Sequence, residues 1–438
     1  MGKTSVAVAI MRALASREVA VGAAKVGPDF IDPAYHELAT GRPSYNLDPV
    51  MTGAAGVRDS VSRAAHGCEL LLIEGVMGLF DGTHLNGPPA PGGLPEGSTA
   101  GVAAELGLPV LLVVDASGTS HSVAATVHGF NSWSSRVRLV GVVANRIGSD
   151  SHLEMVESLL SATGVPLVGH FRRDELPHRP SRHLGLNTVA EDAASASAWV
   201  AELGNAAERS LDLGRIMALC TPLPAPEPAV GRRRASAVVA FSSGPAASFI
   251  YRENIERLAE AGFETVPFDP RFEAPPAAAG LVWLHGGYPE LFLEEIATNV
   301  KLLASLRERV AEGAPTVAEC GGHQLLGRSL NGVSMAGALP FASWIGERPV
   351  IGYRRLTAGQ PVLGGLEKAA PVAHEFHYGR SDAVGEGLLA TAGAVRHPGG
   401  FGTASLLSSY HHLHLGSAPP IAANLLAAAL RYAEERSG

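Results

Sequence analysis

Three short, unbroken apolar runs in the first half of the chain constrain its fold more strongly than any other feature. They are CELLLIEG at 68–75, LPVLLVVDAS at 108–117 and VRLVGVVANR at 137–146, and each ends in polar or small residues. Unbroken apolar runs are typical of parallel strands that are covered on both faces. Helical stretches such as SHLEMVESLLSATG separate them. The sequence therefore predicts an α/β fold with a doubly wound, mostly parallel sheet.

Polar residues follow these strands directly. They are Glu74, Asp115 and Asn145. Because ligands of such sheets bind beyond the carboxyl ends of the strands, we expect the three side chains to border one cleft. A carboxylate at a strand end beside a phosphate loop commonly holds Mg²⁺, although Glu74 taken singly is equally compatible with a helix cap or a solvated loop.

The chain opens with MGKTS, which contains the last part of a phosphate-binding loop. The full pattern is G-x-x-x-x-G-K-[ST], in which backbone N–H groups and the lysine bind nucleotide phosphates. Gly2, Lys3 and Thr4 match its end, and a helical stretch follows them. We therefore expect a P-loop-type nucleotide site at these three residues.

Further charged residues in the first half are candidates for binding phosphates or substrate carboxylates. They lie in KVGPDFIDPAYH, YNLDP and HRPSRHLGL, and comprise Lys25, Asp29, Asp32, Asp48, Arg179, Arg182 and His183. Arginine and lysine clamp such anions well. Taken singly, each is more typical of a solvated loop.

A change in composition marks a domain boundary. The length of 438 residues suits two or three domains, and TPLPAPEPAVGRRR at 221–234 has the proline-rich, then basic composition of a linker. Strand-like runs resume at ASAVVAFSS and GLVWLHGG. We therefore predict a first domain at 1–220, a linker at 221–234 and a second α/β domain at 235–438.

In the second domain, PTVAECGGHQLLG places Cys320 between a short apolar run and a helix start. This is the strand–turn–helix setting of a nucleophile elbow. We expect an exposed thiol whose pKa is lowered by the helix N-terminus. Gly286 and Gly287, in the earlier VWLHGGYPE, can offer backbone N–H groups to an oxyanion. The alternative is a buried structural cysteine at a helix–sheet junction.

Three histidines follow in SSYHHLHLGS: His411, His412 and His414. A strand through this segment would point His412 and His414 to one face and His411 to the other. A cysteine, a glycine pair and a histidine on separate strands make a thiol acyl-transfer site.

Taken in order, the motifs resemble the cobyrinic acid a,c-diamide synthases, whose second domain is a triad-type glutamine amidotransferase of the cobyrinate branch. The resemblance covers essentially the whole chain and rests on GKTS, KVGPDFIDPAYH, NLD, EGVMGLFDG, ANRIGS, SRHLGL, GGYPE, AECGG, HEFHY and SYHHLH. It implies an ATP- and glutamine-dependent ligase that amidates the a and c acetates of a corrin macrocycle through an acyl phosphate. Domain 1–220 would be the P-loop amidoligase and 235–438 the amidotransferase.

The resemblance also implies roles for single residues. Cys320 would be the nucleophile and His412 its base, with Gly286, Gly287 and Gly321 at the oxyanion and glutamine site. The residue two beyond the base is commonly an acid in such enzymes, but it is His414 here, so we expect a Cys–His dyad. In the first domain the implied roles are ATP binding by Gly2, Lys3, Thr4 and Asn145, Mg²⁺ binding by Thr4, Asp48 and Glu74, and substrate or phosphate binding by Lys25, Asp29 and Arg182.

In relatives a strand and a Gly/Ser-rich stretch precede the GKTS motif. We therefore expect the chain as given to start at an internal methionine, and expect weak ATP binding without these residues. Three other functions stay open. One is amidation of another tetrapyrrole, such as nickel-sirohydrochlorin. The second is a nucleotide-blind binding or regulatory protein, against which the retained cysteine and histidine argue. The third is a stand-alone glutaminase-like hydrolase, against which the intact EGVMGLFDG motif argues.

Composition narrows the cellular setting. The net charge of −8 argues against wholesale binding to nucleic acid or anionic membranes. Three scattered cysteines without a C-x-x-C spacing exclude a disulfide framework, and no apolar run is long enough to span a bilayer. We expect a cytoplasmic enzyme with a corrinoid substrate and no nucleic-acid or membrane partner. A homodimer is left open.

Overall fold

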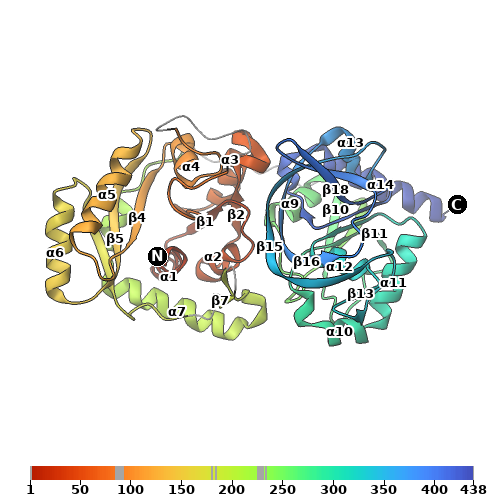
Figure 1. Ribbon diagram of the computed structural model, residues 1–438, viewed down its shortest axis with the longest axis horizontal. Coiled ribbons are helices and arrows are strands. Elements are labelled where there is room, and N and C mark those ends of the chain that lie inside the picture. Colours follow the sequence, from red (N-terminus) through yellow and green to blue (C-terminus); the bar gives the residue numbers. More distant parts are fainter. Residues whose placement is uncertain are drawn as a thin grey trace. The chain divides into compact units, whose positions relative to one another are not determined.

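The computed structural model describes residues 2–83, 93–178, 181, 182, 185–223, 231 and 234–437. Contacts divide the chain into two compact units (Figure 1). The first contains Met1–Pro49 and Ala54–Ala229, and the second contains Val50–Gly53 and Val230–Gly438. The domain boundary predicted at 221–234 stays a prediction, since much of that segment lies outside the described residues.

The first unit alternates helices and strands along most of its length. Its helices are α1 (Lys3–Ser16), α2 (Asp32–Thr40), α3 (Pro49–Ala65), α4 (Thr99–Leu106), α5 (His121–Trp133), α6 (Asp150–Ser161), η1 (Val189–Glu191), α7 (Ala193–Ser210) and α8 (Leu213–Ala218). Its strands are β1 (Val21–Val26), β2 (Ser44–Leu47), β3 (Leu70–Glu74), β4 (Pro109–Asp115), β5 (Arg138–Ile147), β6 (Leu167–Arg172), β7 (Ser181–Arg182) and β8 (Gly185–Leu186).

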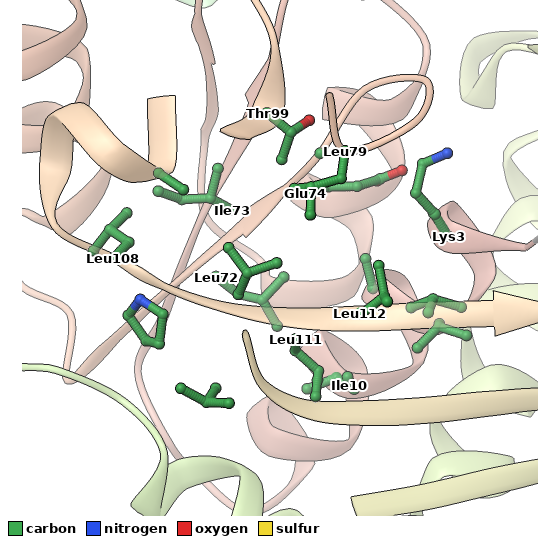
Figure 2. Close-up of a pocket in the computed structure, with 18 of the residues that line it drawn as sticks. Lys3, Ile10, Leu72, Ile73, Glu74, Leu79, Thr99, Leu108, Leu111 and Leu112 are labelled. Carbon is green, nitrogen blue, oxygen red and sulfur yellow. The ribbon is translucent and has the colours of Figure 1, made fainter. Parts of the chain in front are cut away.

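The three apolar runs form β3, β4 and β5, as predicted, and the α/β class with parallel strands is confirmed. The strands form two parallel sheets, however, in the orders β2-β1-β3 and β4-β5-β6. Among the described residues β3 and β4 are not paired. Both line an apolar cavity of about 650 Å³, into which Leu72 and Leu111 project (Figure 2). Paired strands lie about 4.8 Å apart, and here the cavity lies between β3 and β4.

The second unit is built on one large sheet. Its helices are α9 (Arg252–Ala261), η2 (Pro289–Leu291), α10 (Leu293–Thr298), α11 (Val300–Ala311), α12 (Gly321–Leu326), η3 (Leu363–Gly365), α13 (Leu366–Ala369), η4 (Leu415–Ser417) and α14 (Pro420–Ser437). Its strands are β9 (Ala237–Ser242), β10 (Phe263–Phe268), β11 (Ala279–Leu284), β12 (Thr316–Glu319), β13 (Ser329–Leu330), β14 (Val333–Ser334), β15 (Ala342–Thr357), β16 (Val372–Ser381), β17 (Gly387–Ala392), β18 (Val395–Gly402), β19 (Leu406–Ser409) and β20 (His411–His412).

This sheet has a parallel half and a mostly antiparallel half, in which, among the described residues, only the β13–β15 pair is parallel. The order is β10-β9-β11-β12-β19-β18-β17-β15-β13-β14, and the pairs from β10 to β19 are parallel. Every residue of β11 is buried, as its unbroken apolar run AGLVWL requires, because apolar clusters cover both faces. The carboxyl ends of β11 and β12 lead directly into Gly286 and Cys320.

None of the described helices is both long enough and apolar enough to cross a membrane.

Candidate active site

The start of α1 lies at one end of the cavity in the first unit. Gly2 precedes the helix with φ 80°, a left-handed conformation that glycine adopts without strain. A Cβ on Gly2 would lie 2.7 Å from Nδ2 of Asn145, so the end of β5 packs closely against the helix start. Lys3 lines the cavity together with Glu74 (Figure 2). Burial, and then repulsion by Lys25, lower the pKa of Lys3.

A buried group of charged and polar side chains forms where β1 and β3 end. Lys25 and Glu74 are register partners on these neighbouring parallel strands. The Lys25 ammonium donates to Oε1 of Glu74 at 2.9 Å and to Oδ2 of Asp32 at 2.5 Å. The Thr4 hydroxyl bonds to the same two oxygens, at 2.7 Å and 3.2 Å. The structure therefore brings Glu74 beside Thr4 of the phosphate-loop motif, and Lys25 joins them. Of the three strand-end residues, Glu74 and Asp115 line the cavity, and Asn145 lies beside Gly2.

Two further residues complete this group: Asp32, which the sequence argument named only as a candidate for binding phosphate or substrate, and His36, which it did not name. Asp32 supplies the second carboxylate. His36 approaches Oε2 of Glu74 at 2.7 Å through Nε2, and its Nδ1 lies 3.1 Å from the Ser44 hydroxyl. Asp32 and His36 are four residues apart on α2 and so share one face of that helix. That spacing in DPAYH was the signal that could have identified them.

The charges in this group are unequal. Burial alone would raise the pKa of Glu74, but Lys25 and His36 lower it to about 2. Burial would likewise lower the pKa of Lys25, yet Glu74 and Asp32 raise it. Burial, Glu74 and Asp29 raise the pKa of Asp32 to about 8. One lysine thus faces two carboxyl groups. Glu74 stays ionised, whereas Asp32 is the first of the two to bind a proton. A bound cation could replace that proton, so the group can accept additional positive charge.

The remaining predicted site residues of the first unit are not part of the hydrogen bonds that join Lys25, Asp32 and Glu74. Asp29 accepts hydrogen bonds from the N–H groups of Ile31 and Asp32, and so supports the start of α2. Asp48 is fully buried just after β2, and β1 lies between β2 and β3. Arg182 belongs to β7, but its side chain lies outside the described residues, as do Arg179 and His183. The roles predicted for Asp29, Asp48, Asn145 and Arg182 stay predictions.

Mg²⁺ suits the oxygens in the buried group. Hard cations prefer carboxylate and hydroxyl oxygens, and Mg²⁺ commonly takes one or two carboxylates and completes its shell with water and substrate phosphates. Among the described residues, no three His, Cys, Asp or Glu side chains are arranged to hold a metal ion. A metal ion here would therefore depend on Thr4, Glu74 and Asp32 together with a bound phosphate.

In the second unit, Cys320 lies in the sharp turn between β12 and α12. Its backbone has φ 50° and ψ −111°, a strained conformation for a non-glycine residue. Close packing explains the glycines that follow, because a Cβ on Gly321 would lie 2.7 Å from the Pro289 ring and one on Gly322 would lie 2.3 Å from the Leu284 carbonyl oxygen. The predicted nucleophile elbow thus describes the local geometry.

Three glycines surround the thiol. A Cβ on Gly321 would lie 3.2 Å from the Gly287 nitrogen, so these two glycines lie close together beside Cys320, and their backbone N–H groups act to lower the pKa of its thiol. Gly286 fills the space between the thiol and His412, since a Cβ there would lie 3.0 Å from Cβ of Cys320 and 2.4 Å from Cε1 of His412. The structure therefore brings together Cys320, His412 and all three glycines that the sequence argument placed at an oxyanion site.

The state of the thiol differs from our expectation. Cys320 is only 5% exposed, and its sulfur lies 3.7 Å from the carbonyl oxygen of Phe376. Burial, with a contribution from Glu290, raises the pKa of Cys320 to about 12. The prediction of an exposed thiol with a lowered pKa was wrong, because segments distant in sequence cover the turn and burial outweighs the N–H groups of Gly321 and Gly287. The raised pKa keeps the Cys320 thiol neutral.

The three histidines do not lie on one continuous strand, as the alternation argument had assumed. β20 ends at His412, so His414 does not share a strand face with it. His414 instead precedes η4, where its Nδ1 accepts a hydrogen bond from the Gly416 N–H at 3.1 Å. His411 pairs with Glu375 on β16, and His412 pairs with His374. Burial lowers the pKa of His412 well below its ordinary value, so its imidazole is neutral and able to accept a proton.

A buried carboxyl, that of Glu319, lies directly before Cys320 in the chain. Burial raises the pKa of Glu319 to about 8 although the Leu413 N–H donates to its Oε1 at 2.8 Å. The folded chain therefore holds this proton more tightly than the unfolded chain does. The stability that results is fully present below the ordinary pKa of 4.5 and is lost as pH rises to about 8.

We accordingly expect Glu319→Gln, which cannot ionise, to gain stability relative to the parent chain as pH rises. The gain should grow from about pH 5 to about pH 8, by a few kcal/mol, and then level off. Thermal unfolding of the second unit at several pH values measures it. A difference in melting temperature that is constant across this range would show that the carboxyl is ionised at neutral pH.

Two family models match the chain, one in each of its two parts. Residues 1–186 match the family model for the CobQ/CobB/MinD/ParA nucleotide binding domain, and residues 238–420 match that for the CobB/CobQ-like glutamine amidotransferase domain. A hydrogenobyrinate a,c-diamide synthase of Streptomyces coelicolor is 38% identical, covering 96% of this chain and 93% of its own. The hydrogenobyrinate a,c-diamide synthase of Mycobacterium bovis is 39% identical, and the match covers 86% of this chain and 83% of its own. A cobyrinate a,c-diamide synthase of Synechocystis sp. is 35% identical, and the match covers 100% of this chain and 92% of its own.

Proposed function

Since the chain belongs to the family of the hydrogenobyrinate and cobyrinate a,c-diamide synthases, we propose that it amidates the a and c acetate carboxylates of a corrin macrocycle. It is a glutamine-hydrolysing, ATP-dependent carbon–nitrogen ligase of cobalamin biosynthesis. The observation that carries the proposal is the presence in one chain of two separate sites: the buried Lys25–Asp32–Glu74 group beside Thr4, and the Cys320 elbow facing His412.

In the first unit, a substrate carboxylate oxygen attacks the γ-phosphorus of ATP, so that an acyl phosphate forms and ADP leaves. Lys3, at the start of α1, and Lys25, near the end of β1, are the cations that neutralise the charge on the transferring phosphoryl group. Thr4, Glu74 and Asp32 would hold Mg²⁺, which when bound neutralises phosphate charge and orients the phosphates. Asp48 stays a predicted further ligand.

In the second unit, the sulfur of Cys320 attacks the side-chain amide carbon of glutamine. His412 takes the thiol proton and returns it to the departing nitrogen, which leaves as ammonia. The N–H groups of Gly287 and Gly321 stabilise the oxyanion of the tetrahedral intermediate. Water then hydrolyses the thioester and releases glutamate. Because burial raises the pKa of Cys320 and lowers that of His412, the thiol proton passes to the imidazole as the sulfur attacks, and not in advance.

The two half-reactions meet at the acyl phosphate. Ammonia attacks its carbonyl carbon, phosphate leaves, and the amide forms. Repeating the cycle on the second acetate gives the diamide. Releasing ammonia by glutamine hydrolysis avoids a dependence on free ammonia, which is mostly protonated at neutral pH.

An assay of product formation tests the proposal. Hydrogenobyrinate and cobyrinate are supplied in parallel with ATP, Mg²⁺ and glutamine, because the relatives carry both names. We expect a diamide from at least one of them, with glutamate and ADP formed in step. Glutamate formation without any amide from either macrocycle, at saturating ATP, would overturn the proposed substrate.

The adjacent histidines should differ in importance. We expect His412→Ala to lower kcat/KM for glutamine hydrolysis by roughly 10³-fold or more, since general-base catalysis contributes about 10²–10⁴ and the imidazole also receives the thiol proton. His411→Ala should have a much smaller effect, because His411 pairs with Glu375 on the other side of the strand. Steady-state glutaminase assays of both variants check this, and equal effects would contradict the assignment of His412.

A further inference from the structure

The base of the proposed Cys–His pair has no acid at the usual position two residues later. His414 stands there, and its ring accepts from the Gly416 N–H while its Nε2 lies 3.7 Å from Glu253. In a triad the acid holds the histidine in its working orientation. β20, which carries His412, is only two residues long and pairs with β16 alone. Another part of the second unit must therefore fix the His412 segment.

Two buried side chains bind the backbone directly after His412. Glu319, 3% exposed, accepts a hydrogen bond from the Leu413 N–H at 2.8 Å. Asn254, 1% exposed and on α9, donates from Nδ2 to the Leu413 carbonyl oxygen at 2.7 Å. Its Oδ1 accepts from the Leu415 N–H, also at 2.7 Å. Both backbone groups of Leu413 are thus held by side chains that are distant in sequence.

The position of Glu319 gives this arrangement a functional meaning. Glu319 is the last residue of β12 and directly precedes Cys320. Its backbone is continuous with the strained turn that presents the thiol, and its side chain holds the residue next to His412. One residue therefore links the two halves of the proposed pair, and any displacement of its side chain changes the separation of thiol and imidazole.

We propose that Glu319 and Asn254 are positioning residues that hold His412 against Cys320, in place of the acid of a triad. The proposal rests on the Cys320–His412 pair of the proposed function. Neither side chain acts on glutamine. Each acts through the Leu413 backbone, whose buried N–H and carbonyl groups would lose their partners on substitution. A misplacement of about 1 Å in such a pair costs on the order of 100-fold in rate.

Four variants test the proposal. Glu319→Leu and Asn254→Ala remove the contacts, whereas Glu319→Gln keeps the acceptor for the Leu413 N–H. Asn299→Ala is the matched control, because Asn299 makes the same kinds of bond to the Leu302 N–H and the Glu273 carbonyl oxygen elsewhere in this unit. For each variant kcat and KM for glutamine hydrolysis, the rate of Cys320 alkylation by iodoacetamide, and the melting temperature are measured in the full chain.

We expect Glu319→Leu and Asn254→Ala to lower kcat by about 100-fold with little change in KM, and to slow alkylation. Glu319→Gln should stay within about threefold of the parent, because it keeps the hydrogen bond. Asn299→Ala should lower the melting temperature without changing kcat. The proposal is overturned if Asn299→Ala lowers kcat as much as Asn254→Ala does, if Glu319→Gln is as impaired as Glu319→Leu, or if both contact-removing variants keep the parent kcat.

Cys320→Ser separates this inference from the proposed function. If that variant still hydrolyses glutamine, the Cys320–His412 pair itself is wrong. If it is inactive while Glu319→Leu and Asn254→Ala are fully active, only the positioning role fails.

Discussion

We expect Cys320→Ser to lose glutamine-dependent amidation by roughly 10⁴-fold or more, while amidation driven by high concentrations of ammonia continues at the parent rate. Gly286 lies between the thiol and the His412 ring, and the backbone N–H groups of Gly287 and Gly321 act to lower the pKa of the thiol. A serine hydroxyl fits the same turn but is a much weaker nucleophile. Parallel assays with glutamine and with ammonium chloride measure the two activities.

The ammonia arm is the control for this variant, since it uses the first unit alone. Loss of both activities would mean that Cys320 supports the fold, and a melting temperature far below that of the parent chain would accompany it. Retention of glutamine-dependent activity would remove Cys320 from the reaction altogether.

We expect Glu74→Gln to lower ATP-dependent amidation by roughly 10³-fold, with either nitrogen donor, and to leave glutamine hydrolysis largely intact. Glu74 is ionised and shares its Oε1 with Thr4 and Lys25. The amide keeps the shape of the side chain but removes the negative charge that balances Lys25 and that would hold Mg²⁺. ADP formation in the presence of a corrin substrate and ammonia measures the loss.

Glu208→Gln is a suitable control for this substitution in the same unit. It removes an exposed ion pair with Arg17 and should leave ADP formation unchanged. Unchanged ADP formation in Glu74→Gln would exclude Glu74 from the ATP site. A loss of glutamine hydrolysis as large as the loss of ADP formation would show that the two chemistries do not occupy separate sites.

Sequence patterns predicted the parts of the fold that depend on local composition. The unbroken apolar runs became β3, β4 and β5, and the Gly-rich turn after an apolar run became the Cys320 elbow. The strand-end rule placed Glu74 correctly beside Thr4. Each of these features is fixed by residues close together in the chain, so their spacing carried the information.

Features that depend on distant segments could not be read from such patterns. His36 joins Glu74 only because α2 folds over the end of β3, and the burial of Cys320 depends on Phe376 and His412. The strand expected through His414 ends at His412, since Asn254 and Glu319 take over the backbone bonds of Leu413 that a longer strand would have supplied. The division of the strands into two sheets, with a cavity lined by both β3 and β4, was likewise not predicted.

The central claim is that nitrogen released at Cys320 is joined to a carboxylate that ATP has activated in the first unit. The most direct measurement uses glutamine labelled with ¹⁵N in its amide, together with ATP and a corrin substrate, and follows product mass and nucleotide in one reaction. The account predicts a diamide that carries ¹⁵N in both new amides, with one ADP and one phosphate formed for each amide. Unlabelled amides, or AMP and pyrophosphate in place of ADP and phosphate, would contradict it.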